Sequence, residues 1–268
     1  RGEMKPAFAL TEPGGGTDVL ASVKTRARRD GDGWVLNGSK MWISAAARAD
    51  VITVIARTGE HRTRGMSMFA VPGDAKGLSV CELDTAAING LDTCEVAFDE
   101  VRLPGDAVLG EVDQGFMQVL STLNSERLNA AAVATGIGRG AHREAVAYAR
   151  EREAFGRPIG QFQALQHRLV KSGVALEAAW LLTLRAAALD AAGEPFDVAS
   201  SMAKLATAEA GVEAVHVGME VMGGAGIDNR LPMQRYYRDI RLYVFAPITN
   251  DMITNYLGER WLDLPRSF

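Results

Sequence analysis

The sequence predicts an α+β protein of two domains, an antiparallel β-sandwich or barrel followed by an up-and-down bundle of four helices. Up to about residue 105, short β-rich runs alternate with Gly, Pro and Asp, whereas beyond Gly110 apolar residues recur at helical spacing. Strands and helices in separate halves favour segregated domains over alternating βαβ units. We therefore assign residues 1–108 to a β domain and residues 109–268 to a helical domain.

The β domain is expected to contain short strands at regular intervals. Gly31-Asp32-Gly33 marks a turn, and Asn37-Gly38 stands between the runs Trp34–Leu36 and Lys40–Ile43. Asn-Gly between two such runs is a strong hairpin signal, so a hairpin turn is predicted there. Further strands are expected at residues 51–55, 66–71 and 94–98.

The helical domain is expected to hold four helices. In the first, apolar residues recur at helical spacing from Phe116 onward, and an Ala-rich stretch follows to Ala149. The expected ranges of the others are 163–192, about 197–222 with Asp197 as its cap, and 235–258 with an interruption near Pro247.

Composition excludes several classes of protein. The chain has 268 residues, 47% of them hydrophobic, and a net charge of −4, which does not indicate a surface for nucleic acid. No apolar run is long enough to span a bilayer, and Cys81 and Cys94 lack metal-ligand or disulfide spacing. We expect a cytoplasmic protein without a metal ion. Because the chain opens on Arg1 without a leader, we treat it as part of a longer polypeptide.

Two segments of the β domain could bind a ligand. The segment Ala9–Asp18 leads into a Pro-Gly-Gly-Gly turn, whose glycines would let the backbone approach a ligand and expose N–H groups to it. A flexible loop is the alternative. In Met41–Ser44, a Trp beside a hydroxyl could stack on a flat ring and hydrogen-bond its edge, although a Trp in the core is the alternative.

Two segments of the helical domain could also bind a ligand. Arg152 and Arg157 could clamp a diphosphate, or could simply mark a charged helix end. Residues Met222–Gly226 could form a turn between helices or a backbone cradle. No one of these segments is specific by itself.

Their order and spacing resemble the acyl-CoA dehydrogenase family from Ala7 to about Gly258. The segments that carry the resemblance are Ala9–Pro13 followed by Gly16–Asp18, Leu36–Ser44, Asp92–Asp99, Arg152 with Ala154–Gly156, Gly223–Gly226 and Arg238-Asp239. The family fold has an N-terminal helical domain, a middle β domain and a C-terminal four-helix domain, and this chain resembles the last two.

The resemblance implies an activity. It implies an FAD-dependent oxidoreductase that converts an acyl-CoA thioester to the trans-2-enoyl-CoA and passes electrons to an electron-transferring flavoprotein, as in the β-oxidation of fatty acids. It also implies a homo-oligomer, either a dimer or a tetramer.

The resemblance also implies roles for particular residues. The residues that would contact FAD within one subunit are Leu10, Thr11, Gly16, Thr17, Trp42, Ser44 and Thr249, with Thr17 also near the CoA portion of the substrate. Those that would reach the FAD of a neighbouring subunit are Arg152, Phe155, Gly223 and Gly224. Glu220 stands where the family usually has Gln, and its carboxylate would repel a diphosphate.

The catalytic base needs a carboxylate aimed at the α-carbon. Many family members supply it as a Glu in a segment that here reads Phe245–Thr249, with Pro247 at the place of that Glu. The isovaleryl-CoA and long-chain branches place it instead in a segment matching Leu123–Leu128, which makes Glu126 the expected base. A solvated helical Glu is the alternative. Burial would raise the pKa of Glu126, and Arg127 is expected to contact CoA or to be structural.

Two other functions remain open at this stage. The first is a flavin oxidase or monooxygenase of the same superfamily. The second is an inert subunit that resembles an acyl-CoA dehydrogenase, which Pro247 and Glu220 suggest.

Overall fold

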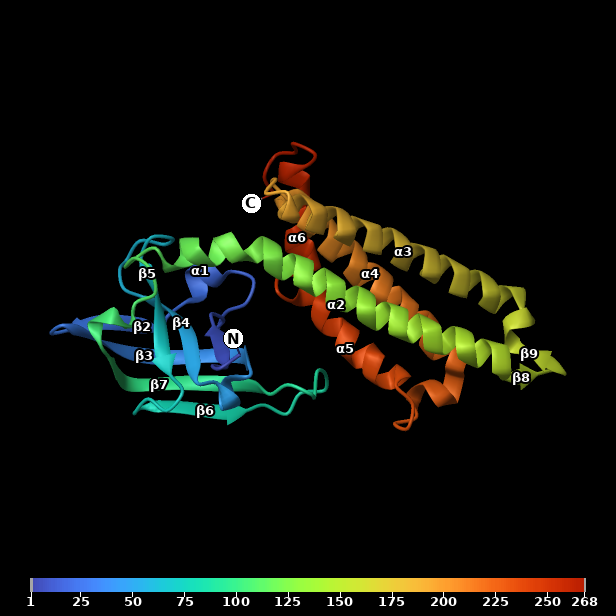
Figure 1. The fold of residues 1–268 in the computed structure, drawn as a ribbon, viewed down its shortest axis with the longest axis horizontal. Helices are drawn as coiled ribbons and strands as arrows, with labels where there is room; N and C mark the ends of the chain where they lie inside the picture. The colour runs from blue at the N-terminus through green and yellow to red at the C-terminus, as the bar shows by residue number, and fades with distance from the viewer. Residues whose placement is uncertain (1, 268) are drawn as a thin grey trace. The chain divides into compact units, whose positions relative to one another are not determined.

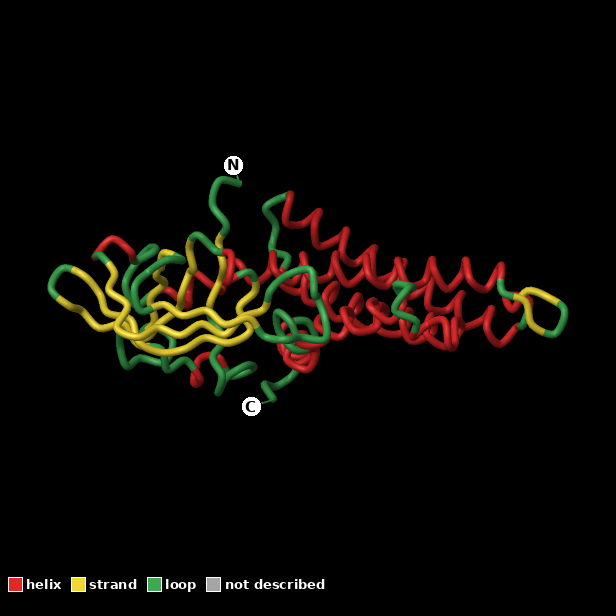
Figure 2. Tube along the Cα trace, turned by 90° about the horizontal axis from the view of Figure 1, so that it is seen from below, coloured by secondary structure: helices red, strands yellow, loops and turns green. Residues whose placement is uncertain are grey.

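The computed structural model describes residues 2–267, which divide into two compact units between Thr122 and Leu123. Among these residues, seven strands form one sheet in the first unit, whereas the second unit is helical apart from one small hairpin (Figure 1, Figure 2). The predicted class, a β domain followed by a helical domain, is confirmed. The two units join within one helix, α2 (Gly115–Glu151).

The sheet of the first unit is mixed. Its strands are β1 (Pro6–Ala9), β2 (Arg26–Asp30), β3 (Gly33–Ser44), β4 (Val51–Arg57), β5 (Met66–Pro72), β6 (Leu78–Glu82) and β7 (Thr93–Leu103). The order is β1-β4-β2-β3-β7-β6, with β5 beside β4. β1 and β2 pair parallel to β4, and the other pairs are antiparallel. Alternate side chains enter the core, among them Trp34, Leu36 and Phe69.

The predicted hairpin at Asn37-Gly38 is wrong, because β3 runs through these residues. Asn37 lies opposite a bulge of β7, where its side chain donates to Glu100 Oε1 (2.6 Å) and accepts from the Glu100 backbone N–H (2.9 Å). A Cβ on Gly38 would lie 2.6 Å from the Cα of Thr25, so this close approach requires glycine. The turn is at Gly31-Asp32, between β2 and β3.

The helices of the second unit follow the expected ranges. They are α2, α3 (Gln163–Ala191), α4 (Asp197–Met222), α5 (Met233–Phe245) and α6 (Asn250–Arg260). The interruption near Pro247 is confirmed, because it separates α5 from α6. The small residues Ala134 and Ala141 of α2 lie in one core cluster with Val215 and Val217 of α4 and add little side-chain bulk to it.

The sequence had suggested that Asp197 caps α4, and the structure shows that it does not. Phe196 occupies the cap position, and Asp197 is the first helical residue, where an acidic side chain is favoured by the helix dipole. Its carboxylate accepts a hydrogen bond from the hydroxyl of Tyr256 in α6. The Asp197 side chain, which the local sequence assigns to the helix cap, is therefore hydrogen-bonded to Tyr256, a residue distant in the sequence.

Short elements connect the longer ones. α1 (Val19–Ser22) follows the glycine-rich loop, and the hairpin of β8 (Glu153–Ala154) and β9 (Arg157–Pro158) links α2 to α3 (Figure 2). The expectation that no apolar run could span a bilayer does not hold for α3, which alone among the described helices is long and apolar enough to do so, a test that core helices of soluble proteins also pass.

Candidate functional site

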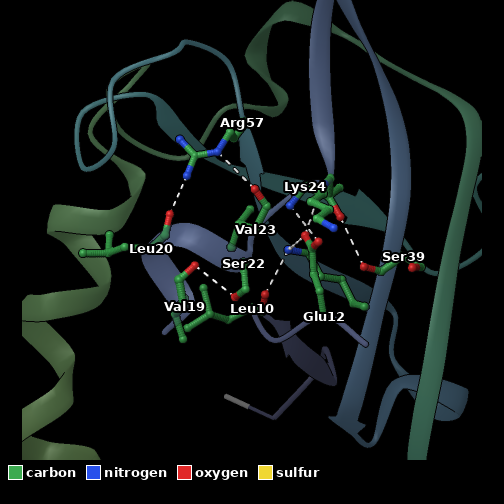
Figure 3. A network of polar contacts seen from close by, with 11 residues as sticks. Leu10, Glu12, Val19, Leu20, Ser22, Val23, Lys24, Ser39 and Arg57 are labelled. Carbon is green, nitrogen blue, oxygen red and sulfur yellow. Dashed lines mark hydrogen bonds and ion pairs between the residues drawn. The ribbon is translucent and has the colours of Figure 1, made fainter. Parts of the chain in front are cut away.

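A buried ion pair fixes the glycine-rich loop to β3. Glu12 in this loop is only 5% exposed, and its carboxylate accepts hydrogen bonds from the backbone N–H groups of Lys24 (2.7 Å) and Thr25 (2.9 Å). It also accepts one from Lys40 Nζ at 2.9 Å, and Lys40 Nζ donates further to the carbonyl of Leu10 (2.9 Å). Figure 3 shows Leu10, Glu12 and Lys24 converging at this point.

The charges of Glu12 and Lys40 each affect the pKa of the other residue. Burial would raise the pKa of Glu12, but the charge of Lys40 and the N–H donors outweigh it, so the pKa is lowered. Burial lowers the pKa of Lys40 to about 8, although Glu12 opposes the shift. A paired, fully hydrogen-bonded carboxylate has little chemistry of its own. Its effect is to hold Leu10 and Thr11 against the strand that carries Trp42 and Ser44.

Trp42 is held on strained backbone with its ring exposed. Met41 donates its backbone N–H to the carbonyl of Thr11 (2.9 Å), and Met41 and Trp42 together face one residue of β7 at a bulge. Trp42 has φ 64° and its side chain is 58% exposed. Left-handed backbone at a large residue persists only where the surroundings enforce it. The expected alternative, a Trp in the core, is therefore excluded by the structure.

Ser44 is exposed and precedes a second anchored turn. The next residue, Ala45, has φ 62° and donates its N–H to the carbonyl of Asp92 (2.9 Å). The Asp92 side chain is 1% exposed, accepts from the N–H of Ala47 (3.1 Å) and pairs with Arg48 Nε (3.3 Å). Although burial opposes it, these donors lower the pKa of Asp92. Asp92 thus fixes the backbone that follows Ser44.

The glycine-rich loop leaves room for a ligand. Gly14, Gly16 and Thr17 are exposed, and a Cβ added at Gly14 or Gly16 would meet nothing within 4 Å. Neither glycine is therefore required by packing within the chain. An exposed indole and an open glycine loop, tied together through Thr11, fit a flat aromatic cofactor with an attached phosphate.

Glu126 lies on α2 in a different kind of environment. Its side chain is half-buried and makes no hydrogen bond or ion pair with the described residues, and burial raises its pKa. Arg127, the next residue, is buried, donates to Asn124 Oδ1 (3.0 Å) and Ser201 Oγ (3.4 Å), and stacks over the ring of Tyr256 at 5.3 Å. The arginine is therefore engaged in packing, whereas the neighbouring carboxylate is available to react.

A buried lysine fixes the turn between α5 and α6. Lys204 Nζ donates to the carbonyl of Ile248 (2.7 Å), to Asn250 Oδ1 (2.7 Å) and, more weakly, to the carbonyl of Val244 (3.4 Å). Burial, with the nearby charge of Arg127, lowers the pKa of Lys204 to about 8. Thr249 caps α6, its oxygen accepting from the Met252 N–H (3.2 Å), so its hydroxyl proton is still free to donate.

The remaining candidate residues gather at the far end of the bundle. Phe155 at the tip of the β8–β9 hairpin is 95% exposed with φ 54°, and exposed Arg152 precedes the hairpin. Residues flanking this hairpin and residues preceding Gly223 belong to one apolar cluster, which includes Ala149, Ile159, Val221 and Met222. Arg152 and Gly223-Gly224 therefore lie at the same end.

The structure does not bring Glu126 and Arg152 together. The helix rises 1.5 Å per residue, so about 39 Å of α2 separates these two positions. A site that used both residues would have to take them from two chains. Glu220, expected to repel a diphosphate, forms an ion pair with Arg168, and its Oε1 lies 3.6 Å from Nε2 of His216. No cluster of potential metal ligands occurs among the described residues.

Comparison with known proteins gives consistent matches. The family models described as "Acyl-CoA dehydrogenase, middle domain" and "Acyl-CoA dehydrogenase, C-terminal domain" match residues 7–101 and 113–262. The short-chain specific acyl-CoA dehydrogenase of Bos taurus is 41% identical over 243 residues, which are 90% of this chain but 59% of the bovine protein.

Two solved structures share the fold. Butyryl-CoA dehydrogenase from Megasphaera elsdenii has a TM-score of 0.93 at 30% identity, over 97% of this chain and 68% of that one. A chain in a structure described as the electron transferring flavoprotein of Acidaminococcus fermentans has a TM-score of 0.94 at 33% identity, over 97% of this chain and 69% of that one.

Proposed function

Because the chain belongs to the acyl-CoA dehydrogenase family, we propose that it catalyses the FAD-dependent α,β-desaturation of an acyl-CoA thioester to the trans-2-enoyl-CoA. Bound FAD would accept the hydride from the β-carbon. Glu126 would remove the α-proton, and Arg127 would hold the helix around it in place. The observation that carries this proposal is the contrast between the unpaired, half-buried Glu126 and its neighbour Arg127, which is hydrogen-bonded and stacked on Tyr256.

The raised pKa of Glu126 supports its role as base. A carboxylate that is poorly solvated is a stronger base than one in water, and the α-proton of a thioester is only weakly acidic. Pro247 stands where the commoner base would be, and it cannot accept a proton. Within the second unit, Glu126 is thus the carboxylate that both the family resemblance and its environment favour.

The cofactor contacts divide between two chains. Leu10, Thr11, Gly16, Thr17, Trp42 and Ser44 would hold the flavin of their own subunit, and Thr249 can donate a hydrogen bond to it. Arg152, Phe155, Gly223 and Gly224 would contact the flavin of a neighbouring subunit. The length of α2 between Glu126 and Arg152 and the exposure of Phe155 support this division. A homo-oligomer, either a dimer or a tetramer, follows from it.

The names of the relatives guide the choice of substrate and partner. One relative is a short-chain specific acyl-CoA dehydrogenase and another is a butyryl-CoA dehydrogenase, so butyryl-CoA is the first substrate to test. The fold match to a chain from an electron transferring flavoprotein structure supports such a flavoprotein as the electron acceptor.

Anaerobic titration of the FAD-loaded, full-length protein with butyryl-CoA tests the proposal. Flavin absorbance near its long-wavelength maximum should bleach, and the enoyl-CoA product should form in equal amount. An inert subunit would stay yellow or bind no flavin. An oxidase would bleach as well, but its reduced flavin would be reoxidised rapidly when air is admitted, whereas a dehydrogenase would need the electron-transferring flavoprotein.

A further inference from the structure

The guanidinium of Arg127 is a buried cation with neutral neighbours. Arg127 is only 8% exposed, and its described contacts are Asn124 Oδ1 (3.0 Å), Ser201 Oγ (3.4 Å) and the ring of Tyr256 (5.3 Å). Its Nε is also buried and makes no hydrogen bond with the described residues. A buried charge is costly unless a negative charge or strong acceptors compensate it. The compensation therefore has to come from behind these neutral groups.

Asp197, the first residue of α4, is connected to Arg127 through both of the contacts that lie outside α2. The hydroxyl of Tyr256 donates to the carboxylate of Asp197, and Ser201 Oγ donates to the backbone carbonyl of Asp197 (2.7 Å). The two helices that supply these groups, α4 and α6, pack against each other (Figure 1). A tyrosine that donates to a carboxylate has a more electron-rich ring, and a serine that donates presents its lone pairs to another donor. Both bridges thus direct negative potential toward Arg127.

The pKa values of the bridged groups agree with this connection. The hydrogen bond from Tyr256 is the main cause of the lowered pKa of Asp197, and the charge of Arg127 adds to it. Burial lowers the pKa of Arg127, and Tyr256, Asp197 and Glu126 oppose that shift. Burial and the hydrogen bond to Asp197 raise the pKa of Tyr256 to about 12, so its hydroxyl remains a donor at neutral pH.

The other charged groups around this contact are cations. Burial and the charge of Arg127 lower the pKa of Lys204 in α4, and Arg260 of α6 acts on the same tyrosine. The acids that act on Arg127 are Asp197 and Glu126. If Asp197 were neutral, the charge of Arg127 would therefore be opposed by Glu126 alone.

Glu126 is the residue that such a change would affect. It precedes Arg127, whose contact with Asn124 fixes the turn of α2 on which all three residues lie. Burial raises the pKa of Glu126, and the charge of Arg127 opposes the rise. Because a carboxylate becomes a weaker base as its pKa falls, a group that offsets the charge of Arg127 keeps Glu126 more basic.

We infer that Asp197 is a positioning residue for the reaction. Through the two groups that bridge them, it holds Arg127 in place and offsets the positive charge beside Glu126. The inference rests on the proposed function for the role of Glu126 as the base, whereas the connection from Asp197 to Glu126 can be measured without turnover.

The test titrates Glu126 directly, in the FAD-loaded, full-length protein. Isotope labelling of the glutamate carboxyl carbons gives an NMR titration curve for each glutamate, and the signal of Glu126 is the one that Glu126→Gln lacks. Asp197→Asn removes the charge and keeps an acceptor for Tyr256. Glu209→Gln is the matched control, because it removes the same charge from an exposed position of the same helix.

In Asp197→Asn the titration midpoint of Glu126 should fall by roughly 0.5–1 pH unit, less than the 1–3 units that a charge in direct contact produces. The acid limb of the pH profile for flavin reduction by butyryl-CoA should move by the same amount. Above that limb the rate should fall about 2- to 5-fold, because the base is weaker. Glu209→Gln should change none of these quantities, and Asp197→Glu, which keeps the charge, should leave the midpoint near its wild-type value. An unshifted or raised midpoint in Asp197→Asn would overturn the inference.

Comparison of the titration with the kinetics separates this inference from the proposed function. If the midpoint falls while the rate profile stays in place, the connection from Asp197 to Glu126 stands and the choice of Glu126 as the base fails. A slower rate with an unchanged midpoint would show that Asp197 serves folding alone, and the inference would be wrong. If Asp197→Asn does not fold, Tyr256→Phe releases the carboxylate and keeps the ring beside Arg127. Its midpoint should then fall by a smaller amount, and an unchanged midpoint would again contradict the inference.

Discussion

Glu12 and Glu126 are two glutamates shielded from solvent, one in each unit, and the structure treats their carboxylates in opposite ways. Glu12 accepts hydrogen bonds from Lys40 and from two backbone N–H groups, which together lower its pKa against the effect of burial. Glu126 has no such partner, and burial raises its pKa. Glu12 thus fixes the position of the segments around it, whereas the carboxylate of Glu126 is free to accept a proton.

This difference between the two carboxylates indicates that Glu12 contributes to stability and Glu126 to reactivity. A buried carboxylate with all its partners anchors the segments that carry Trp42 and Ser44, and removing one partner exposes a large desolvation cost. A carboxylate without partners, such as Glu126, contributes little to the free energy of folding, but it remains able to accept a proton from a substrate. Substitutions in the two units should therefore affect different observables.

The largest effect is expected for Glu126→Gln, which keeps the size of the side chain and removes its basicity. The rate of flavin reduction by butyryl-CoA should fall roughly 10²–10⁴-fold, as for the loss of a general base. The unfolding free energy at neutral pH should be at least that of wild type, because an unpaired, half-buried charge is removed. Stopped-flow absorbance and urea denaturation measure the two quantities.

Glu144→Gln on the same helix is the matched control and should reduce flavin at the wild-type rate. A normal rate in Glu126→Gln would exclude this residue as the base. A large loss of stability in Glu126→Gln would instead show that the carboxylate is an anchor like Glu12, and the contrast between the units would disappear.

The next effect in size is expected for Lys40→Met in the first unit. This change leaves Glu12 buried with no cation, which should cost about 3–5 kcal/mol of unfolding free energy. Adding Glu12→Gln should restore most of the loss, because the amide oxygen still accepts from Lys24 or Thr25 while no charge remains. Urea denaturation of the single and double variants measures the coupling.

Lys204→Met provides the comparison for the second unit. Lys204 donates only to two carbonyls and an amide oxygen, so its loss leaves neutral acceptors unpaired and should cost about 1–3 kcal/mol. If Lys204→Met were as destabilising as Lys40→Met, the buried charge of Glu12 would not be the reason for the larger loss.

The pH dependence of stability should distinguish the two glutamates by sign. The lowered pKa of Glu12 means that its contribution is present above the unfolded value of 4.5 and is lost as the pH falls through the folded value. The raised pKa of Glu126 means that its contribution is present below 4.5 and is lost as the pH rises through the folded value.

Glu12→Gln should therefore be less stable than wild type at neutral pH, whereas Glu126→Gln should be equally or more stable. Both differences should shrink in acid, where each glutamate becomes as neutral as the glutamine that replaces it. Urea denaturation from neutral pH to below the folded pKa of Glu12, which lies under 4.5, gives these differences directly. Two differences of the same sign would contradict the opposite pKa shifts.

Part of this arrangement could be predicted from the sequence. The change from short strands to a helical period gave the correct class, and the helix ranges were close because the apolar period and the break at Gly193 are local signals. The hairpin at Asn37-Gly38 was wrong because the residue that uses Asn37 is Glu100, which is far away in the sequence. Asp197 was misjudged for the same reason, since its partner is Tyr256.

The anchors of the candidate site could not be predicted in this way. Lysine is rarely buried, so no pattern identifies Lys40 as a core residue until Glu12 is known to lie beside it. Asp92 is equally ordinary in sequence, and only its partners in space reveal what it positions. The roles proposed for Glu126, Trp42 and Ser44 came from the family resemblance, and the structure adds their environments.

The smallest effect is expected for Ser44→Ala. This change tests whether the Ser44 side chain contributes to cofactor binding without contributing to the stability of the first unit. The Ser44 hydroxyl is exposed and forms no hydrogen bond with the described residues, so its removal should not change the unfolding free energy of the flavin-free protein. If the hydroxyl bonds the flavin, FAD affinity should fall by about 0.5–1.5 kcal/mol, measured by fluorescence titration of the apoprotein. Ser79→Ala, at an exposed position of β6, should leave both quantities unchanged. Loss of stability without FAD would show that Ser44 belongs to the anchor together with Glu12 and Asp92. An unchanged affinity would remove Ser44 from the cofactor site, and the strained backbone on either side of it would then serve Trp42 alone.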